Sequence, residues 1–411
     1  MRHATSLPEP SADALSHSER LISLIRDEIE ANSGSISFKR YMEMALYQPG
    51  LGYYVAGTHK LGEQGDFITA PEISPLYSRC IANQCAEILQ SMRSHDNVGA
   101  KRRRPEGRDK IESKVGGCVL ELGAGSGVMA ADILLELEKQ NQLPEKYFIL
   151  DLSPDLIQRQ QQTLQKHAAH LFEHVEWLSS LPTEFDGIII ANEVLDAMPV
   201  DVFTQQDGSV YEHHVIFENN QLYEQLKHAN ENLKQQVLRL NIPAEATPYT
   251  SEINPNIEAW LKTLSESLKN GVMLLMDYGY PRSEYYLPER NKGTLICHYQ
   301  HLVNESPIYY PGLQDITASV DFTAVAEAAD TAGLKVSGFT SQAGFLANAG
   351  LEKYFMQALD TNPDDQYKLA QQVRTLSLPS EMGERFKCIA LSKHYESELM
   401  GFSELDQRYR L

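Results

Sequence analysis

A glycine-rich turn constrains the fold of this chain more than any other part of its sequence. The turn reads Glu121-Leu122-Gly123-Ala124-Gly125-Ser126-Gly127, after a short apolar run at 118–120 and before a helix-like stretch at 128–138. A strand, a glycine turn and a helix in this order are the setting in which an adenine-containing cofactor lies across the carboxyl end of a parallel sheet. Glycine is needed there because a side chain would block close approach of the backbone to the ligand. The turn therefore predicts an α/β fold with such a cofactor beside it.

The spacing of the glycines separates this turn from two other ligand-binding turns. A dinucleotide fingerprint, G-x-G-x-x-G, would place its third glycine where Val128 stands, and a P-loop would end in Gly-Lys-Ser or Gly-Lys-Thr, which this turn lacks. An acidic residue followed by G-x-G-x-G is the pattern of S-adenosylmethionine (SAM) methyltransferases. The pattern predicts SAM as cofactor, contacted by Glu121, Gly123, Ala124, Gly125 and Gly127. It leaves open a turn whose glycines serve only a tight bend.

Composition excludes several classes of partner. The chain has 411 residues and a net charge of -20, which opposes general nucleic-acid binding and anionic membrane surfaces. Its five cysteines are scattered without a C-x-x-C pair, as expected of reduced thiols in the cytoplasm. The sequence has no apolar run long enough to span a bilayer. Residues 1–20 have no apolar signal core and carry acidic residues, so we expect a cytoplasmic bacterial protein, or a matrix protein if the source has mitochondria.

Strands and helices alternate from residue 117 onward. Apolar runs predict strands at 117–122, 147–150, 174–178, 187–191, 272–276, 335–340 and 386–391, with helices between several of them. Residues 200–250 alternate and turn like an inserted hairpin and arm. The pattern predicts a doubly wound, mostly parallel, Rossmann-like sheet with an N-terminal helical cap and an insertion after the fourth strand. We expect two parts, a cap with a lid loop and linker at 1–115 and the cofactor domain at 116–400, with the insertion at about 200–255.

The N-terminal part holds two segments of special composition. The tract 48–74 is rich in glycine and aromatic residues, which is more typical of a lid or binding loop than of a plain connection. Residues 93–116 follow an expected helix at 75–92 and contain the basic run 101–104. We interpret them as a solvated linker; nucleic-acid contact is the alternative, which the acidic chain disfavours.

Three groups of candidate ligands follow the carboxyl ends of strands, where open α/β sheets bind their ligands. The first is the glycine turn. The second is Asp151, whose carboxylate could accept both ribose hydroxyls of an adenosine; the alternative is a residue that only starts the next helix. The third is Asn192-Glu193-Val194-Leu195-Asp196, in which a helical turn would place Glu193 and Asp196 on one side. The alternative there is a solvated helix start that favours acidic residues.

Several blocks of sequence resemble the MidA-like class I SAM methyltransferases, a family that includes the mitochondrial arginine methyltransferase needed for respiratory complex I assembly. The resemblance spans about residues 35–392, and the Gly-Asp-Phe and Asn-Glu-Val-Leu-Asp blocks are its most specific motifs. The basic 93–116 insert and the lack of an evident presequence depart from the mitochondrial relatives and suit a bacterial member. The matching blocks lie at 41–47 with 52–54, 65–74, 121–127, 192–200 and 315–322, with further matches at 251–255, 277–280, His301 and 382–386.

The resemblance implies SAM in the main cleft and a protein side chain, arginine, entering beneath the N-terminal lid. The acceptor protein would be a respiratory complex I subunit or a similar protein, and a homodimer is an open expectation. Methyl transfer from a sulfonium is an in-line displacement, which needs alignment and exclusion of water but no metal. A carboxylate could form a bidentate ion pair with a guanidinium and orient one nitrogen toward the methyl group. Glu193 is the first candidate for that role, followed by Asp196 and Glu72; Asn192 and Asp151 are assigned to the cofactor.

Other interpretations stay open from the sequence. Asp277 could serve either ligand, and His301 could be a base, an aromatic wall or a packed histidine. Cys297, His298 and His301 are too weakly spaced to make a good zinc site, so we expect no metal. The alternatives for function are a small-molecule methyltransferase on the same fold and an assembly chaperone that binds SAM. The intact glycine turn and Asp151 favour an enzyme over the chaperone.

Overall fold

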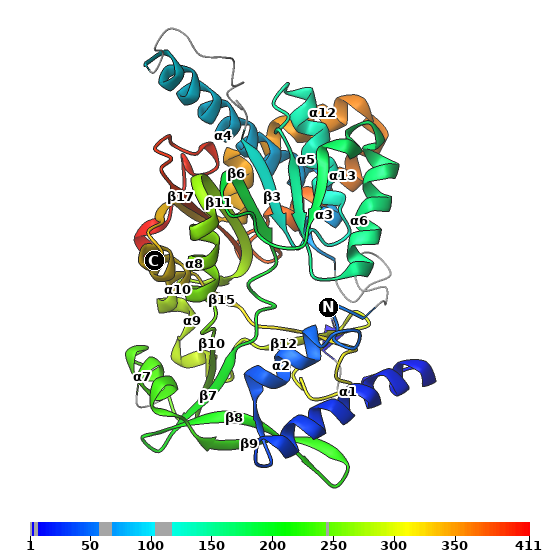
Figure 1. Ribbon diagram of the computed structural model, residues 1–411, viewed down its shortest axis with the longest axis vertical. Helices are drawn as coiled ribbons and strands as arrows, with labels where there is room; N and C mark the ends of the chain where they lie inside the picture. Colours follow the sequence, from blue (N-terminus) through cyan, green and yellow to red (C-terminus); the bar gives the residue numbers. More distant parts are fainter. Residues whose placement is uncertain (1, 4–6, 57–67, 103–116, 244–245) are drawn as a thin grey trace.

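An eight-stranded sheet forms the centre of the molecule, with the order β16-β17-β11-β6-β3-β4-β5 and with β15 beside β11 (Figure 1). The computed structural model describes residues 2–3, 7–56, 68–102, 117–243 and 246–411. In this sheet β5, β4, β3, β6, β11 and β15 run parallel, whereas β17 is antiparallel to both β11 and β16. The mostly parallel sheet predicted from the sequence is therefore confirmed. Its strands are β3 (Cys118–Leu122), β4 (Tyr147–Leu150), β5 (Val175–Leu178), β6 (Phe185–Asn192), β11 (Leu268–Tyr280), β15 (Val320–Asp321), β16 (Lys335–Ser341) and β17 (Phe386–Lys393).

Helices cover both faces of this sheet, because successive side chains of its buried strands point in opposite directions. Ile188 and Ile190 of β6 pack into one apolar cluster with α4 (Pro75–Arg102), α5 (Val128–Lys139) and α6 (Pro154–His167). Ile189, between them, packs into a second cluster with α8 (Ile257–Ser267) and α10 (Phe322–Thr331). The doubly wound α/β fold is therefore confirmed.

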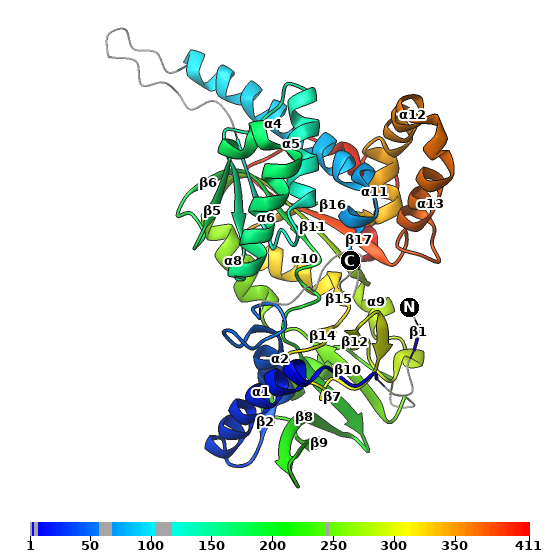
Figure 2. The same cartoon turned by 90° about the vertical axis from the view of Figure 1, so that its right-hand side faces the viewer.

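Between β16 and β17 the chain forms three helices that the sequence analysis did not predict. They are α11 (Gln342–Asn348), α12 (Leu351–Thr361) and α13 (Gln366–Ser377). Buried residues of all three, among them Leu346, Tyr354 and Leu376, join the cluster that contains α4 and α5. Helices α11 and α12 contact α4, and α13 packs against α11 and α12 (Figure 2).

The insertion after β6 builds a second sheet. β7 (Asp201–Gln206), β8 (Ser209–Glu218), β9 (Gln221–His228) and β10 (Tyr249–Ile253) are joined by β2 (Ile36–Ser37), and α7 (Glu231–Arg239) follows β9. The N-terminal helices α1 (Ala12–Ala31) and α2 (Phe38–Tyr47) pack on this sheet (Figure 1). The N-terminal cap and the insertion therefore form one body, although about 150 residues separate them in sequence.

A third segment of the chain completes this body. A small sheet of β1 (Arg2–His3), β13 (Leu302–Asn304), β12 (Ile296–Tyr299) and β14 (Asp315–Thr317) lies next to α2. Cys297 and Ile316 share an apolar cluster with Ile25 of α1, Met42 of α2 and Val215 of β8. In contrast, α4 packs on the central sheet. A domain division at residue 115 stays a prediction.

The lid and linker expectations fall partly outside the described residues. Of the 48–74 tract, the structure describes residues 48–56 and 68–74. The second range contains the short helix α3 (Ala70–Ile73). Gly65-Asp66-Phe67 lies outside the described residues. Helix α4 continues to Arg102, so the expected linker at 93–116 is helical over its first ten residues, and 103–116 also lie outside. In the described part of the chain, no helix combines the length and apolarity needed to cross a bilayer.

Candidate functional site

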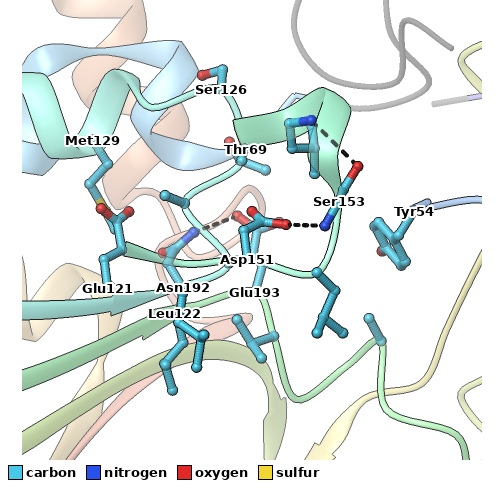
Figure 3. A pocket seen from close by; sticks show the side chains of 18 of the residues that line it. Tyr54, Thr69, Glu121, Leu122, Ser126, Met129, Asp151, Ser153, Asn192 and Glu193 are labelled. Carbon is cyan, nitrogen blue, oxygen red and sulfur yellow. Dashed lines mark hydrogen bonds between the residues drawn. The ribbon is translucent and has the colours of Figure 1, made fainter. Parts of the chain in front are cut away.

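A cavity of about 320 Å³ lies where β3, β4 and β6 end, at the carboxyl edge of the central sheet (Figure 3). These three strands are neighbours, with Leu122 of β3 in register with Leu150 of β4 and with Ala191 of β6. The parallel pairing therefore brings together three loops that are far apart in sequence. Eight of the predicted site residues line the cavity: Glu72, Glu121, Gly123, Ala124, Gly125, Asp151, Asn192 and Glu193.

The glycine turn forms one wall of the cavity. Gly123 and Gly125 have φ angles of +65° and +54°, in the left-handed region that side chains other than glycine rarely adopt. Gly127, with φ +82°, is the N-cap of α5 and falls outside the described lining of the cavity. A Cβ atom on Gly127 would lie 2.8 Å from Cα of Gln160 in α6. Glycine is thus required at 127 by the close approach of α6, while Gly123 and Gly125 face the cavity.

Asp151 follows β4 and is held by two hydrogen bonds. Its Oδ1 accepts from the N–H of Ser153 at 3.0 Å, and its Oδ2 accepts from Nε2 of Gln160 at 2.7 Å. Burial raises the pKa of Asp151 above its usual value, and these hydrogen bonds oppose the shift. The Ser153 hydroxyl caps α6 through the N–H of Leu156. Asp151 therefore lies at a helix start and in the cavity at once, so the two sequence interpretations do not exclude each other.

Gln160 is a site residue that the sequence analysis missed. It is buried in α6, where its Nε2 also donates to the Gly125 carbonyl oxygen at 3.1 Å and its Oε1 accepts from Nε1 of Trp177 at 3.0 Å. Gln160 thus ties the glycine turn to Asp151 and β5. A single glutamine within a polar helix gives no sequence signal for such a role.

The carboxyl group of Glu121 lies in the cavity wall, and only one of its two oxygens has a hydrogen-bond partner among the described residues. Its Oε2 accepts from the Tyr147 hydroxyl at 2.7 Å, whereas Oε1 is buried and has no hydrogen-bond partner among the described residues. Glu121 is 1% exposed, and burial raises its pKa to about 7. A buried carboxyl in this state is a good place for a cationic group, because an incoming positive charge would stabilise its ionised form.

Glu193 projects into the cavity from an unusual backbone conformation. Its φ is +53°, and its N–H donates to the Met276 carbonyl oxygen at 2.9 Å across from β11. Its Oε1 accepts from Nδ2 of Asn192 at 3.2 Å (Figure 3). Burial, followed by the nearby Asp196, raises the pKa of Glu193 to about 8. A carboxyl group with this raised pKa is only partly ionised at neutral pH, and a cation beside it would favour its ionised form.

Asp196 lies near Glu193, but the two residues do not share the helical turn that the sequence suggested. No helix begins at 193, because Glu193 has a left-handed φ and the N–H groups of Leu195 and Asp196 both donate to Oδ2 of Asp277. Asp196 is consequently buried outside the described lining of the cavity. Burial and then Asp277 hold the pKa of Asp196 well above its usual range. The expectation that both carboxylates share one side of a helical turn is therefore wrong.

Asp277 also lies outside the described cavity lining, so the structure gives it no direct contact with a ligand there. It is fully buried and accepts the two N–H groups of the loop after β6 from the neighbouring strand β11. Its function in the structure is to fix the loop that carries Glu193. His301 lies in the turn between β12 and β13 with φ +61°, also away from the described lining.

The opposite wall comes from the N-terminal cap. Glu72 of α3 lines the cavity and accepts a hydrogen bond from the Ser126 hydroxyl of the glycine turn. Tyr47 and Tyr54 also line it, with stacked rings whose centroids are 5.6 Å apart. Their hydroxyls donate to the Ala197 carbonyl oxygen at 2.9 Å and to Oδ1 of Asp315 at 2.8 Å. The sequence analysis placed Tyr54 in the expected lid or binding loop at 48–74 and Tyr47 only in a block that resembles the family; it gave neither ring a function of its own.

The residues of the cavity fit SAM in four respects. The half-buried aspartate that follows β4 can accept ribose hydroxyls, and the left-handed glycines let the backbone approach a ligand. The unpartnered Oε1 of Glu121 offers negative charge to the cationic amino-acid part. Apolar side chains suited to an adenine ring complete the lining; they include Leu156, Leu181, Trp260 and Leu264. In the described ranges, no three His, Cys, Asp or Glu residues are grouped so that they could hold a metal ion.

Comparison with known proteins agrees with this geometry. Residues 80–340 match the family described as "putative S-adenosyl-L-methionine-dependent methyltransferase". A crystal structure of a Burkholderia thailandensis protein bound to S-adenosyl-homocysteine has a TM-score of 0.89 and 36% identity, and the match covers 99% of this chain and 100% of that one.

Relatives from several animals carry the name protein arginine methyltransferase NDUFAF7, mitochondrial, or are named as its homolog. The Drosophila melanogaster protein is 27% identical over 93% of this chain and 87% of its own length. The Homo sapiens protein is 25% identical over 91% of this chain and 88% of its own length. The chain belongs to the family of SAM-dependent methyltransferases that residues 80–340 match, and its cofactor is S-adenosyl-L-methionine.

Proposed function

We propose that this enzyme transfers a methyl group from SAM to a guanidinium nitrogen of an arginine side chain in a protein. The observation that carries the proposal is the position of Glu193 in a cavity that also has Tyr47 and Tyr54 on its wall. A guanidinium is planar and always charged; it pairs with carboxylates and stacks on aromatic rings. The names of the relatives support the same acceptor.

The cofactor is assigned to the side of the cavity formed by β3 and β4. Asp151 is placed to accept the ribose hydroxyls, and Gly123, Ala124 and Gly125 allow close backbone contact. Glu121 faces the positively charged amino-acid part, and Asn192 completes the boundary with the acceptor. SAM, when bound, supplies a methyl group on a positively charged sulfur.

Glu193 is assigned to the acceptor. The approach of a guanidinium favours the ionised form of Glu193, whose pKa is about 8 without a cation in the site. The carboxylate can then orient one nitrogen toward the methyl group, which is the main requirement of an in-line displacement. A new N–C bond forms as the S–C bond breaks, and the methylated nitrogen loses one proton. Glu193 is placed to accept that proton.

Glu72 and Asp196 are given secondary functions. Glu72 is bonded to Ser126, so we assign it to the junction between α3 and the glycine turn. Asp196 lies outside the described cavity lining, so we assign it no contact with the acceptor; its proximity is one cause of the raised pKa of Glu193. The family resemblance suggests a respiratory complex I subunit as acceptor protein and the bacterial cytoplasm as the location.

The test is transfer of labelled methyl from SAM to proteins of a lysate, followed by identification of the modified residue. Glu193→Gln keeps the shape of the side chain but removes its charge. We expect SAM affinity to stay nearly unchanged and methyl transfer to fall by about two orders of magnitude, the scale expected for one positioned electrostatic group. The matched control is Glu184→Gln, an exposed glutamate before β6.

Each result has a distinct meaning. Wild-type turnover of Glu193→Gln would rule out its assignment to the acceptor, and loss of SAM binding would move Glu193 to the cofactor. Label in small molecules alone would favour a small-molecule methyltransferase. Absence of transfer despite SAM binding would favour an assembly chaperone.

A further inference from the structure

Tyr77 reaches the acceptor side of the site without touching the cavity. It lies near the start of α4, is 1% exposed and falls outside the described cavity lining. Its hydroxyl donates to Oδ1 of Asn192 at 2.5 Å, and Nδ2 of Asn192 donates to Oε1 of Glu193 at 3.2 Å. Two hydrogen bonds therefore connect a core helix with the carboxyl group that faces the acceptor.

The two bonds together fix the orientation of the Asn192 amide. With the amide reversed, its carbonyl oxygen would face the Glu193 carboxylate and two acceptors would be opposed. The hydroxyl of Tyr77 donates to the carbonyl oxygen and thereby holds the amide N–H groups on the side of Glu193. Without that hydroxyl, Oδ1 of Asn192 would lose its hydrogen-bond donor in a partly buried place, which is costly.

We infer that Tyr77 is a positioning residue for methyl transfer, which acts through the Asn192 amide to hold the Glu193 carboxyl group in place for the acceptor. The part of this inference that concerns the acceptor rests on the proposed function. The hydrogen bonds from Tyr77 through Asn192 to Glu193 do not depend on the proposed function and can be tested separately.

The surroundings of Glu193 explain why one amide donor matters. The interactions that raise the pKa of Glu193 are burial and the charges of Asp196 and Asp315; those that lower it are the hydrogen bonds from Asn192 and from the Ala70 N–H of α3. No Lys, Arg or His is among these groups in the described residues. Other titratable groups also face it or share its cavity: Asp277 of β11, Tyr77 of α4, Glu72 of α3, Glu121, Asp151, Tyr47 and Tyr54.

The first experiment measures Glu193 itself and needs no acceptor. Infrared difference spectra across a pH titration, with Glu193→Gln as the subtraction reference, report the protonated Glu193 carboxyl group. The wild-type midpoint is expected near 8. Tyr77→Phe should raise it by about one unit, since a hydrogen bond to a charged group is worth roughly that shift. Tyr354→Phe is the matched control, because Tyr354 is also a buried tyrosine in contact with α4. The guanidinium of Arg79 in α4 lies over its ring.

The second experiment measures kcat/KM for the acceptor against pH. In Tyr77→Phe the acidic limb should move to higher pH by the same amount, so activity near pH 7 falls about tenfold and recovers above pH 9. The KM for SAM should not change. In the Glu193→Gln background, Tyr77→Phe should cause no further shift, because a residue that acts through Glu193 cannot act when its carboxyl group is absent.

These results separate the possible failures. An unchanged infrared midpoint in Tyr77→Phe overturns the inference, as does an equal loss of activity at every pH. A normal infrared shift without any arginine methylation in the wild type would overturn the proposed function and leave the positioning of Glu193 standing. If Tyr77→Phe does not fold, Asn192→Asp gives the same test with Tyr77 intact. Replacing the amide donor with a carboxylate must then raise the midpoint, and an unchanged value overturns the inference.

Discussion

Glu121 provides a sharp test of the electrostatics of the cavity. Its carboxyl group is 1% exposed, and burial raises its pKa from 4.5 to about 7. The folded state therefore binds more protons than the unfolded state between these two values. The favourable contribution of the neutral group is fully present below pH 4.5 and is lost as the pH rises through about 7. Wild-type stability should decline over this interval as far as Glu121 determines it.

Glu121→Gln removes this dependence, because an amide does not titrate. A shift from 4.5 to about 7 corresponds to about 3 kcal/mol when complete, of which about 2.5 kcal/mol falls between pH 5 and pH 8. The variant has its own constant cost, since one end of the amide lacks a partner. The informative quantity is therefore the difference in unfolding free energy between variant and wild type, which should move by about 2.5 kcal/mol in favour of the variant from pH 5 to pH 8.

The assay is urea unfolding followed by circular dichroism at pH 5, 6, 7 and 8, without SAM. Tyr147→Phe is the companion variant, because it removes the hydrogen bond that lowers the Glu121 pKa and should steepen the decline. A difference between Glu121→Gln and wild type that stays constant across this range would show that Glu121 is ionised in the folded protein. The interpretation of its unpartnered oxygen as a cation site would then lose its basis.

Three further substitutions test the cofactor side. Gly125→Val should abolish SAM binding in calorimetry, because φ is +54° and the side chain enters the cofactor wall, whereas Gly208→Val in the β7–β8 turn, with a similar φ of +73°, should bind SAM normally; binding by both would misplace the site. Asp151→Asn should weaken SAM about ten- to a hundredfold, and an unchanged affinity would remove Asp151 from the ribose. Gly127→Ala should lower stability by about 1–3 kcal/mol through its contact with Gln160, and an unchanged melting temperature would contradict that contact.

Local sequence patterns were enough to predict the central sheet. The buried strands of a parallel sheet are continuous apolar runs, so β3, β4, β6 and β11 could be recognised without tertiary information. The glycine turn and the polar residues after these runs also have local signals. Because parallel strands end at one edge, Glu121, Asp151 and Glu193 could be expected in a common site.

The sequence could not predict contacts made by residues without a local signal. Gln160 and Tyr77 are ordinary helix residues until the folded chain places them beside Asp151 and Asn192. The sequence did not predict that the N-terminal cap shares one apolar core with two distant segments, because that core joins α1, β8 and β12. Such pairings depend on which apolar faces remain uncovered after the central sheet has formed.

The sequence by itself determined the order of the strands along the chain, the cofactor turn and the carboxylates that end beside it, because each depends on neighbouring residues. Tertiary structure alone decided the environment of each carboxylate. Asp277 captures the N–H groups after Glu193, so the loop does not become a helix, Asp196 is buried and Glu193 faces the cavity. The pKa of a carboxyl group depends on burial and on charges brought from other strands, and no local pattern encodes these.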